Sequence, residues 1–252
     1  MAGTRAGFAR QVITSLDNAR VKEVVRLRTS RERRRCGLFV AEGPREVERA
    51  RAAGLRIVST YFAPELLDWP EGEPVSARVL AKMAYRASPE GVLAVVEAPE
   101  RELPRGGSLY LVAVGIEKPG NLGAMARSAD AAGADALVVA DAVSDPWNPN
   151  AIHSSTGAVF TLPVVSATLE EICALDVQLV AAIVGAPTRY TDADLRRPTA
   201  LVVGSEDAGL DGRWRETADI TVSIPMGGRS ADSLNAASAA SVILFEALRQ
   251  RA

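Results

Sequence analysis

Hydrophobic runs and amphipathic stretches alternate along most of this 252-residue chain. In the second half, runs rich in Val, Ile, Leu and Ala are separated by stretches with the three-to-four-residue spacing of helices. Nearly continuous apolar strands of this kind are typical of a parallel sheet with helices on both faces. The pattern predicts strands at residues 109–116, 136–140, 177–184, 200–203 and 220–224.

The N-terminal part has shorter signals. Residues 14–35 combine a partial apolar face with polar residues at the start, which predicts one helix capped by Thr14, Ser15 or Asp17. The other predicted elements are strands at 38–40, 57–62 and 91–96 and helices at 43–54 and 76–85.

Residues 98–107 are polar and rich in Pro and Gly, which indicates a linker. We therefore predict an α/β protein with a smaller N-terminal domain, residues 1–103, and a C-terminal domain with a mostly parallel sheet, residues 108–252.

The charge is distributed unevenly. The formal net charge is −2, but residues 1–36 carry +7 and the remainder carries −9. A basic end on a neutral or acidic body is typical of a protein that binds a polyanion such as a nucleic acid. A solvated helix face is the alternative, since Arg and Lys favour helices. The basic side chains considered for RNA are Arg20, Lys22, Arg26, Arg33, Arg34, Arg35 and Arg45.

Several classes of protein are disfavoured. The chain has no run of eighteen apolar residues and no secretory signal pattern, so we expect a cytoplasmic protein outside the membrane. Cys36 and Cys173 form no CxxC pair and are expected to be reduced, buried thiols. The single histidine, His153, excludes most metal sites, and it lacks the surroundings of a Ser-His-Asp triad. We therefore expect chemistry without a metal.

Polar residues follow the strand predicted at 109–116. In the small-residue helix that comes next, Arg127 lies four positions after Gly123, which leaves the arginine room to reach an anion at the edge of the sheet. An arginine on a solvated helix face is the alternative. The glycines lack GxGxxG spacing, so an oxidoreductase using Asp141 for a nucleotide is only a second hypothesis.

Two further polar segments follow later strands. Residues 204–210 place glycines around Glu206, and residues 224–235 lead through a Pro and Gly turn to Ser233 and Asn235. Each segment alone has a structural explanation, as a turn or as a helix cap.

The last helix is predicted over residues 233–251, with Ser233 or Asp232 as its cap and Asn235 in its first turn. Its apolar residues are expected to be core contacts: Leu234, Val242, Phe245 and Leu248.

Together, residues 121–133, 204–210 and 224–250 resemble, in order and spacing, the three motifs of the SpoU/TrmH family of RNA ribose 2′-O-methyltransferases. The N-terminal part, through residues 39–43 and 89–92, is similar to the family's L30e-like substrate-binding domain. The resemblance implies a SPOUT-type α/β domain with a deep trefoil knot, S-adenosyl-L-methionine as cofactor and a homodimer. It also implies methylation of RNA, with large-subunit ribosomal RNA favoured. The alternatives are a transfer RNA 2′-O-methyltransferase and an RNA-binding relative without activity.

The resemblance also implies roles for single residues. Arg127 would act at the ribose 2′-hydroxyl with the help of Asn121, while Glu206, Ser233 and Asn235 would complete the catalytic set. The implied cofactor-binding residues are Val203, Gly204, Ile224, Met226, Ser233, Leu234 and Asn235. A free guanidinium is a poor base, so Arg127 is expected either to accept a proton in the assembled site or to bind phosphate and stabilise the developing alkoxide.

Overall fold

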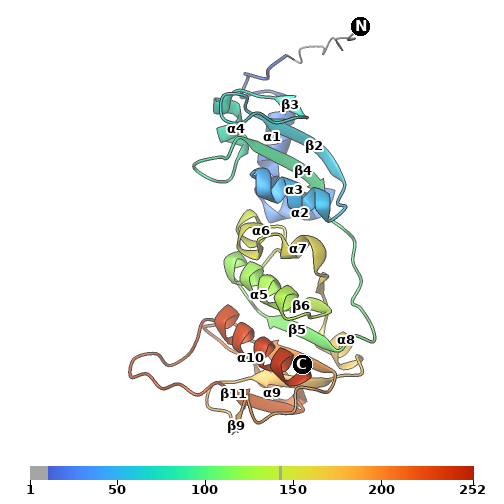
Figure 1. The fold of residues 1–252 in the computed structure, drawn as a ribbon, viewed down its shortest axis with the longest axis vertical. Coiled ribbons are helices and arrows are strands. Elements are labelled where there is room, and N and C mark those ends of the chain that lie inside the picture. The colour runs from blue at the N-terminus through green and yellow to red at the C-terminus, as the bar shows by residue number, and fades with distance from the viewer. Residues whose placement is uncertain (1–10, 142–143) are drawn as a thin grey trace. The chain divides into compact units, whose positions relative to one another are not determined.

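A computed structural model describes residues 11–141 and 144–252. The chain divides into two compact units, Met1–Ala98 and Pro99–Ala252, and the division falls within the predicted linker (Figure 1). Arg5 and Arg10, which contribute to the basic charge of the N-terminus, lie outside the described residues.

The N-terminal unit is an antiparallel sheet with one parallel edge strand, covered by helices. It contains α1 (Ala19–Arg26), α2 (Ser30–Cys36), β1 (Leu38–Glu42), α3 (Pro44–Ala52), β2 (Ile57–Phe62), β3 (Glu73–Pro74), α4 (Ala77–Met83) and β4 (Val92–Glu97). The strand order is β1-β4-β2-β3. Val24 of α1 and Leu80 of α4 pack with Leu93 of the central strand in one buried cluster. This packing fixes the helices on the sheet.

The helix predicted over residues 14–35 is in fact two helices. The first is capped by the side chain of Asn18, and neither Thr14, Ser15 nor Asp17 has that role. It ends at Arg26, and a second begins at Ser30 because Thr29 adopts an extended conformation and its hydroxyl accepts a hydrogen bond from Glu32 N. A Thr-x-x-Glu pattern is a helix-start signal, and it divides the basic segment.

The C-terminal unit is built on a seven-stranded sheet in which every paired strand is parallel, as predicted. Its strands are β5 (Leu109–Val114), β6 (Ala136–Ala140), β7 (Val164–Ser166), β8 (Gln178–Ala182), β9 (Thr188–Arg189), β10 (Thr199–Val203) and β11 (Ile220–Ser223). Its helices are α5 (Pro119–Ala131), α6 (Pro149–Ser155), α7 (Ala158–Thr161), α8 (Leu169–Cys173), α9 (Gly212–Thr217) and α10 (Ala236–Arg251). The strand order is β7-β6-β5-β10-β8-β11-β9. The short strands β7 and β9 were missed by the sequence pattern.

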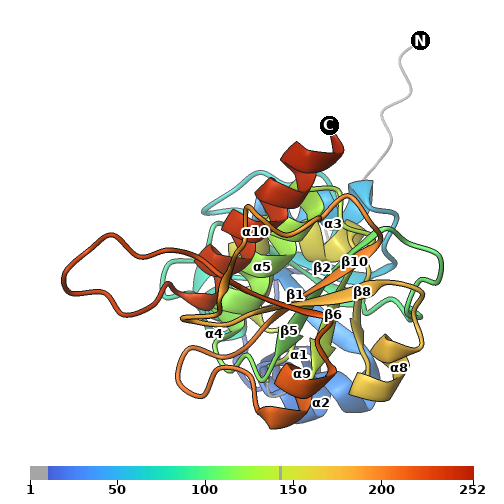
Figure 2. The ribbon, with the colours of Figure 1, turned by 90° about the horizontal axis from the view of Figure 1, so that it is seen from below.

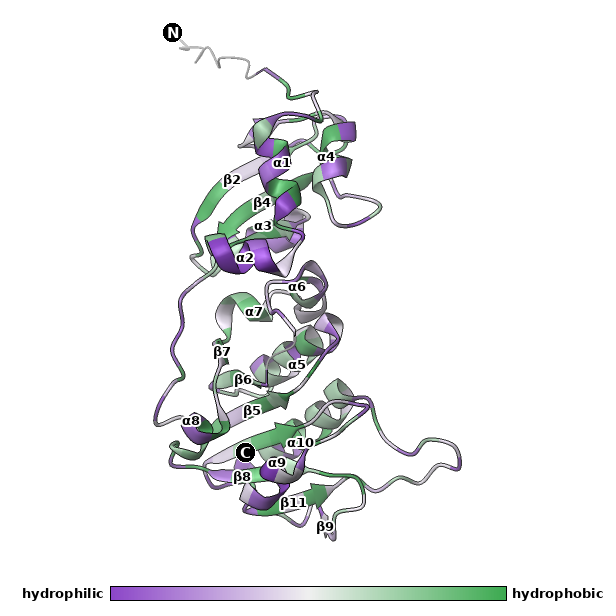
Figure 3. Ribbon diagram, turned by 180° about the vertical axis from the view of Figure 1, so that it is seen from behind, coloured by the Kyte–Doolittle hydropathy of each residue, from purple (hydrophilic) through white to green (hydrophobic). Residues whose placement is uncertain are grey.

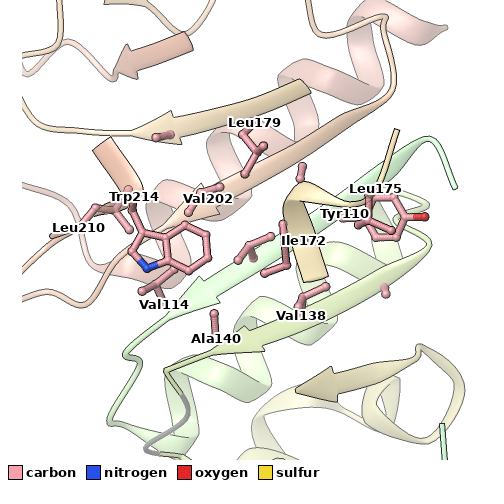
Figure 4. Close-up of a cluster of buried hydrophobic side chains, with 14 of the residues drawn as sticks. Tyr110, Val114, Val138, Ala140, Ile172, Leu175, Leu179, Val202, Leu210 and Trp214 are labelled. Carbon is pink, nitrogen blue, oxygen red and sulfur yellow. The ribbon is translucent and has the colours of Figure 1, made fainter. Parts of the chain in front are cut away.

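Helices cover both faces of this sheet, as predicted. Figure 2 shows α5 and α10 on one side of the strands and α8 and α9 on the other. On the α8 and α9 side, the indole of Trp214 packs with Val114 and Val202, and Ile172 extends the same cluster (Figure 4). Because side chains alternate along a strand, the intervening residues of β5 and β10 face α5 and α10.

Hydrogen bonds order the end of α10 and join it to the loop before β10. The Glu246 carboxylate accepts hydrogen bonds from Arg249 Nη2 at 2.7 Å and from Gln250 Nε2 at 2.8 Å. These bonds, the one from Arg249 first, lower the pKa of Glu246 to about 2. Arg251 donates to the carbonyl oxygens of Leu195 and Arg197. The last helix is therefore attached to the loop that precedes β10.

The outer face of α10 differs from the prediction. Phe245 is 49% exposed, Leu248 37% and Leu234 36%, and Val242 is only half-buried. The predicted core role of these residues is therefore wrong within one chain. The helix instead buries the face that carries Ala240, Leu244 and Ala247. Small side chains allow α10 to pack closely on α5.

Candidate active site

The predicted polar segments meet at the carboxyl edge of the parallel sheet. Strands β5 and β10 are neighbours, so the start of α5 and the loop after β10 lie side by side. The chain continues from β5 to one side of the sheet and places β8 and β11 on the other. A change of direction of this kind opens a crevice at the strand ends, where α/β proteins bind ligands.

Glu206 is the centre of a small polar cluster at this edge. Its Oε1 accepts hydrogen bonds from Asn121 Nδ2 and from Asn235 Nδ2, the latter at 2.6 Å. Asn235 Nδ2 also lies 3.2 Å from Asn121 Oδ1. Lys118 Nζ lies 3.7 Å from Glu206 Oε2. Three segments that are distant in the sequence are thus held together around one carboxylate.

Asn235 links this cluster to the last helix. Its Oδ1 accepts hydrogen bonds from Ala237 N at 3.0 Å and from Ser238 N at 3.3 Å, so Asn235 is the N-cap of α10. The prediction that Ser233 or Asp232 caps this helix, with Asn235 in the first turn, is wrong. One side chain therefore both starts the helix and donates to Glu206.

A cavity of about 190 Å³ opens next to the cluster, and Glu206, the centre of the cluster, also lines the cavity. Six predicted cofactor residues line it: Val203, Gly204, Ile224, Met226, Ser233 and Leu234. Asn235 contributes to the cluster and not to the cavity wall. The lining residues that were not among the predicted cofactor-binding or catalytic residues are Ala182, Ile183, Val184, Ser205, Gly209, Leu210, Arg215, Val222, Ala236 and Ala239.

Most of these additional residues lie at strand ends or in the turns that follow them. Ala182 ends β8 and Val222 lies in β11, both next to the predicted segments in the sheet. Their position at the carboxyl edge is a signal that strand prediction could have used. Lys118, at the start of α5, could have been found in the same way.

Gly204 allows the loop after β10 to fold back tightly. A Cβ at this position would lie 2.4 Å from the carbonyl carbon of Gly209, a contact that no side chain can make without moving the backbone. Gly209 N donates to Ser205 O at 3.0 Å and closes the turn. Glu206, inside this turn, is thereby held between the cluster and the cavity.

Arg127 is not part of the cluster in this chain. It lies on α5 six residues after Asn121, which places it on a different side of that helix. The side chain is exposed and makes no hydrogen bond or ion pair with the other described residues. Gly123, buried against Ala151 of α6, serves the packing of two helices: a Cβ would lie 2.2 Å from the Ala151 oxygen.

The basic residues predicted to bind RNA differ in their exposure. Arg33 is 3% exposed and its Nη1 donates to Leu27 O at 2.7 Å, so its guanidinium joins α2 to the end of α1 and is withdrawn from the surface. Its assignment to the RNA surface is therefore wrong. The other six are exposed: Arg20, Lys22, Arg26, Arg34, Arg35 and Arg45. Figure 3 shows α2 as a strongly hydrophilic helix.

Three features expected from the sequence concern the thiols, metal sites and membrane spans. The side chains of Cys36 and Cys173 are both exposed, so the expectation that they are buried is wrong. No group of three or more His, Cys, Asp or Glu side chains in residues 11–141 and 144–252 is arranged to hold a metal ion. None of the helices described is both long and apolar enough to cross a bilayer.

Comparisons with known proteins match both units. Residues 108–245 match the SpoU rRNA methylase family, and residues 18–94 match the MRM3-like substrate binding domain. A 23S rRNA (uridine(2479)-2′-O)-methyltransferase from Streptomyces viridochromogenes is 34% identical, over 99% of this chain and 95% of the relative.

Solved structures agree. A crystal structure of an RNA 2′-O ribose methyltransferase is 41% identical, with a TM-score of 0.84 over 96% of this chain and 99% of that one. An AdoMet-bound rRNA methyltransferase from Sinorhizobium meliloti is 30% identical, with a TM-score of 0.84 over 95% of this chain and 97% of that one. With matches of this extent to family model, relative and structures, the chain belongs to the SpoU rRNA methylase family.

Proposed function

We propose that this protein transfers a methyl group from S-adenosyl-L-methionine to a ribose 2′-hydroxyl of large-subunit ribosomal RNA. One observation carries the proposal: Glu206 lines the cavity expected to bind the cofactor and is hydrogen-bonded to Asn121 and Asn235. The name of the Streptomyces relative, which methylates 23S rRNA, supports the substrate class.

The cavity suits S-adenosylmethionine. Its wall combines apolar side chains such as Ile224 and Leu234, which would pack against a planar base, with the Ser205 and Ser233 hydroxyls for polar groups. Glu206 contributes a negative charge beside it, which would favour a cationic ligand. When bound, the cofactor supplies an activated methyl group on a sulfonium, so no metal is required.

The protein's own residues would then align the reacting groups and exclude water. The glycine turn at Gly204 lets the backbone approach a ligand closely, and Asn121 and Asn235 hold Glu206 in one orientation. We assign to Arg127 either acceptance of the 2′-hydroxyl proton or stabilisation of the negative charge on that oxygen. Its exposed side chain is open to a second macromolecule.

We further propose that the active form is a homodimer. Val242, Phe245 and Leu248 follow one another at three-residue spacing on the outer side of α10, and Phe245 is 49% exposed. Exposed apolar side chains grouped on one helix are typical of an interaction site, and a second copy would bury them. Phe245→Glu is expected to convert a dimer to monomers in sedimentation velocity experiments, while an equally dimeric variant would refute this interface.

We also propose a knotted chain path, an RNA-binding role for the N-terminal unit and a cytoplasmic location. The late strand β10 lies between the earlier strands β5 and β8, an interleaving that supports a knotted path around the cavity. For the N-terminal unit, we propose an L30e-like role in RNA binding, supported by its exposed basic residues. An enzyme that modifies ribosomal RNA works where ribosomes are made, so we assign it to the cytoplasm.

Methyl transfer tests the function. The full chain is incubated with methyl-labelled S-adenosylmethionine and with 23S ribosomal RNA or transfer RNA, and ribose methylation is mapped by primer extension at low nucleotide concentration. We expect one labelled site in 23S ribosomal RNA. Label in transfer RNA alone would favour the transfer RNA alternative, and cofactor binding without transfer to any RNA would favour an inactive RNA-binding protein.

Arg127→Lys tests the proposed role of the arginine. Lysine retains the charge but loses the planar guanidinium, so the pH-rate profile and the rate itself are expected to change. The control is Arg105→Lys, an exposed arginine in the linker. A profile that Arg127→Lys leaves unaltered would exclude both roles.

A further inference from the structure

Tyr85 is an exposed aromatic residue of the N-terminal unit that the basic-residue pattern did not indicate. It follows Ala84, the C-cap of α4, and is 46% exposed. The surrounding segment connects α4 to β4. Single exposed apolar residues are common on protein surfaces, so exposure alone assigns nothing to Tyr85.

The backbone at Tyr85 is held from two directions. Tyr85 N donates to Glu42 Oε2 at 2.8 Å, and Arg86 N donates to Glu42 Oε1 at 3.2 Å. On the other side, Arg28 Nη2 donates to Lys82 O at 2.8 Å and also to Ala84 O. The side chains of Glu42 and Arg28, from distant parts of the unit, therefore fix the backbone before and after Tyr85.

The Glu42 anchor is costly to build. This side chain is only 5% exposed, at the end of β1, and burial of a carboxylate is unfavourable unless hydrogen bonds replace its water. Glu42 uses those bonds to fix the backbone of an exposed aromatic residue. Because the backbone is already ordered, stacking of a flat ligand on the ring would not require ordering of this segment.

The charges nearby favour a base over a phosphate as the group that binds. Arg86 lies next to Tyr85 but is paired with Glu90 and lies 3.7 Å from Glu46, so two carboxylates offset its charge. The Arg28 guanidinium is bound to the carbonyl oxygens of Lys82 and Ala84. Stacking of bases on aromatic rings depends little on net charge, whereas phosphate binding requires uncompensated basic residues.

We propose that Tyr85 is a stacking platform for an unpaired base of the RNA substrate, positioned by Glu42 and Arg28. The inference rests on the proposed function, because it assigns the platform to the same RNA that is methylated. Arg26 and Arg34, which are exposed on α1 and α2, would contact phosphates without regard to sequence. Tyr85 would add recognition of single-stranded RNA, in which bases are free to stack on protein side chains.

Binding of model RNAs tests the platform. The full chain is titrated with a fluorescein-labelled seven-nucleotide single-stranded adenylate and with an oligomer of the same length whose central bases are replaced by abasic sites. Wild type is expected to bind the complete oligomer more tightly. Tyr85→Ala should weaken that binding by about 5- to 150-fold, the range measured for one lost stacked base, and leave abasic binding unchanged.

Matched variants separate stacking from other effects. Tyr85→Phe keeps the ring and should keep the affinity, and Val58→Ala, at a 50% exposed residue on β2, should change neither titration. Glu42→Gln should reduce the preference for bases while circular dichroism shows a folded chain. The dependence of affinity on salt should be the same for Tyr85→Ala as for wild type, because no phosphate contact is removed.

The outcomes are distinguishable from failure of the proposed function. Equal affinities of Tyr85→Ala and wild type for the complete oligomer, or wild type with no preference for bases over abasic sites, would overturn the platform while methyl transfer to ribosomal RNA continued. Absence of methyl transfer by wild type would instead refute the proposed function. An equal loss on both oligomers would assign Tyr85 to the fold of the unit and overturn the inference.

Discussion

Asn235 has two roles at the active site, and substitutions can separate them. Its Oδ1 caps α10 and its Nδ2 donates to Glu206 at 2.6 Å. Ser and Asp cap helices about as well as Asn does, whereas Ala does not. Asn235→Ser therefore removes the donor, Asn235→Asp replaces it with a carboxylate, and Asn235→Ala removes both donor and cap.

The expected losses of stability follow from these contacts. A hydrogen bond to a charged group contributes roughly 1.5–3 kcal/mol, and the Ser variant should lose about 1–2 kcal/mol because Glu206 keeps its bond from Asn121. The Ala variant should lose about 1 kcal/mol more of unfolding free energy, because it also loses the helix cap. The Asp variant places two carboxylates in contact, so at pH 8 it should lose about 2–4 kcal/mol of unfolding free energy. The favourable interaction of the new charge with the helix dipole should reduce this loss by about 0.5 kcal/mol.

The Asp variant also has a characteristic pH dependence. Two adjacent carboxylates share a proton as the pH falls, and the shared proton restores a hydrogen bond in the place of the lost amide. Its deficit relative to wild type should therefore shrink between pH 8 and pH 5, while the deficits of Ser and Ala stay nearly constant.

Urea unfolding at the two pH values, followed by tryptophan fluorescence, measures these differences; Trp147 and Trp214 both report on the C-terminal unit. A Ser variant as stable as wild type would show that the amide bond to Glu206 contributes nothing. An Asp variant with the same deficit at both pH values would show that the two side chains are not in contact in solution.

Three further predictions concern the cavity, the last helix and the N-terminal unit. Gly204→Ala should weaken cofactor binding by about tenfold or more in calorimetry, because its Cβ would lie 2.4 Å from the backbone, whereas Gly227→Ala, with open space around it, should not. Glu246, with its folded pKa at about 2 and an unfolded value near 4.3, should contribute about 1–3 kcal/mol above pH 5; this is lost as the pH falls through both values, and Glu246→Gln should flatten that part of the acid-unfolding curve. Arg33→Ala should destabilise the chain by about 1–3 kcal/mol in urea, while Arg34→Ala should change stability by less than about 0.5 kcal/mol and lower RNA affinity instead.

Sequence periodicity predicted the central sheet well because its information is local. Residues 136–140 form β6 as predicted, and the neighbouring apolar runs form buried parallel strands with shifts of only a few residues. Buried strands need apolar side chains on both faces, and this requirement is visible in any short window of sequence. The edge strand β9 has only two residues and no such requirement, so the pattern missed it.

The outer face of α10 could not be predicted in this way. The pattern predicts that an apolar residue on an amphipathic helix is buried, but it does not identify the element or partner that covers it. Here the small residues of α10 face α5, and Phe245 and Leu248 remain exposed. The same ambiguity affected Arg33, whose charge indicates the surface, although its side chain satisfies a carbonyl oxygen at the end of α1.

The active-site cluster depends on contacts over long sequence separations. Asn121 lies 85 residues before Glu206 and 114 residues before Asn235, so the register of β5, β10 and β11 decides whether they meet. Motif order identified these residues, but only the strand order explains why they share one edge of the sheet. Because Glu206 belongs to both cluster and cavity, a change that moves Asn235 or the glycine turn must alter cofactor binding and the start of α10 together. Catalysis and stability are therefore coupled at this edge, and the Asn235 variants should lose cofactor affinity in the same order in which they lose stability at pH 8.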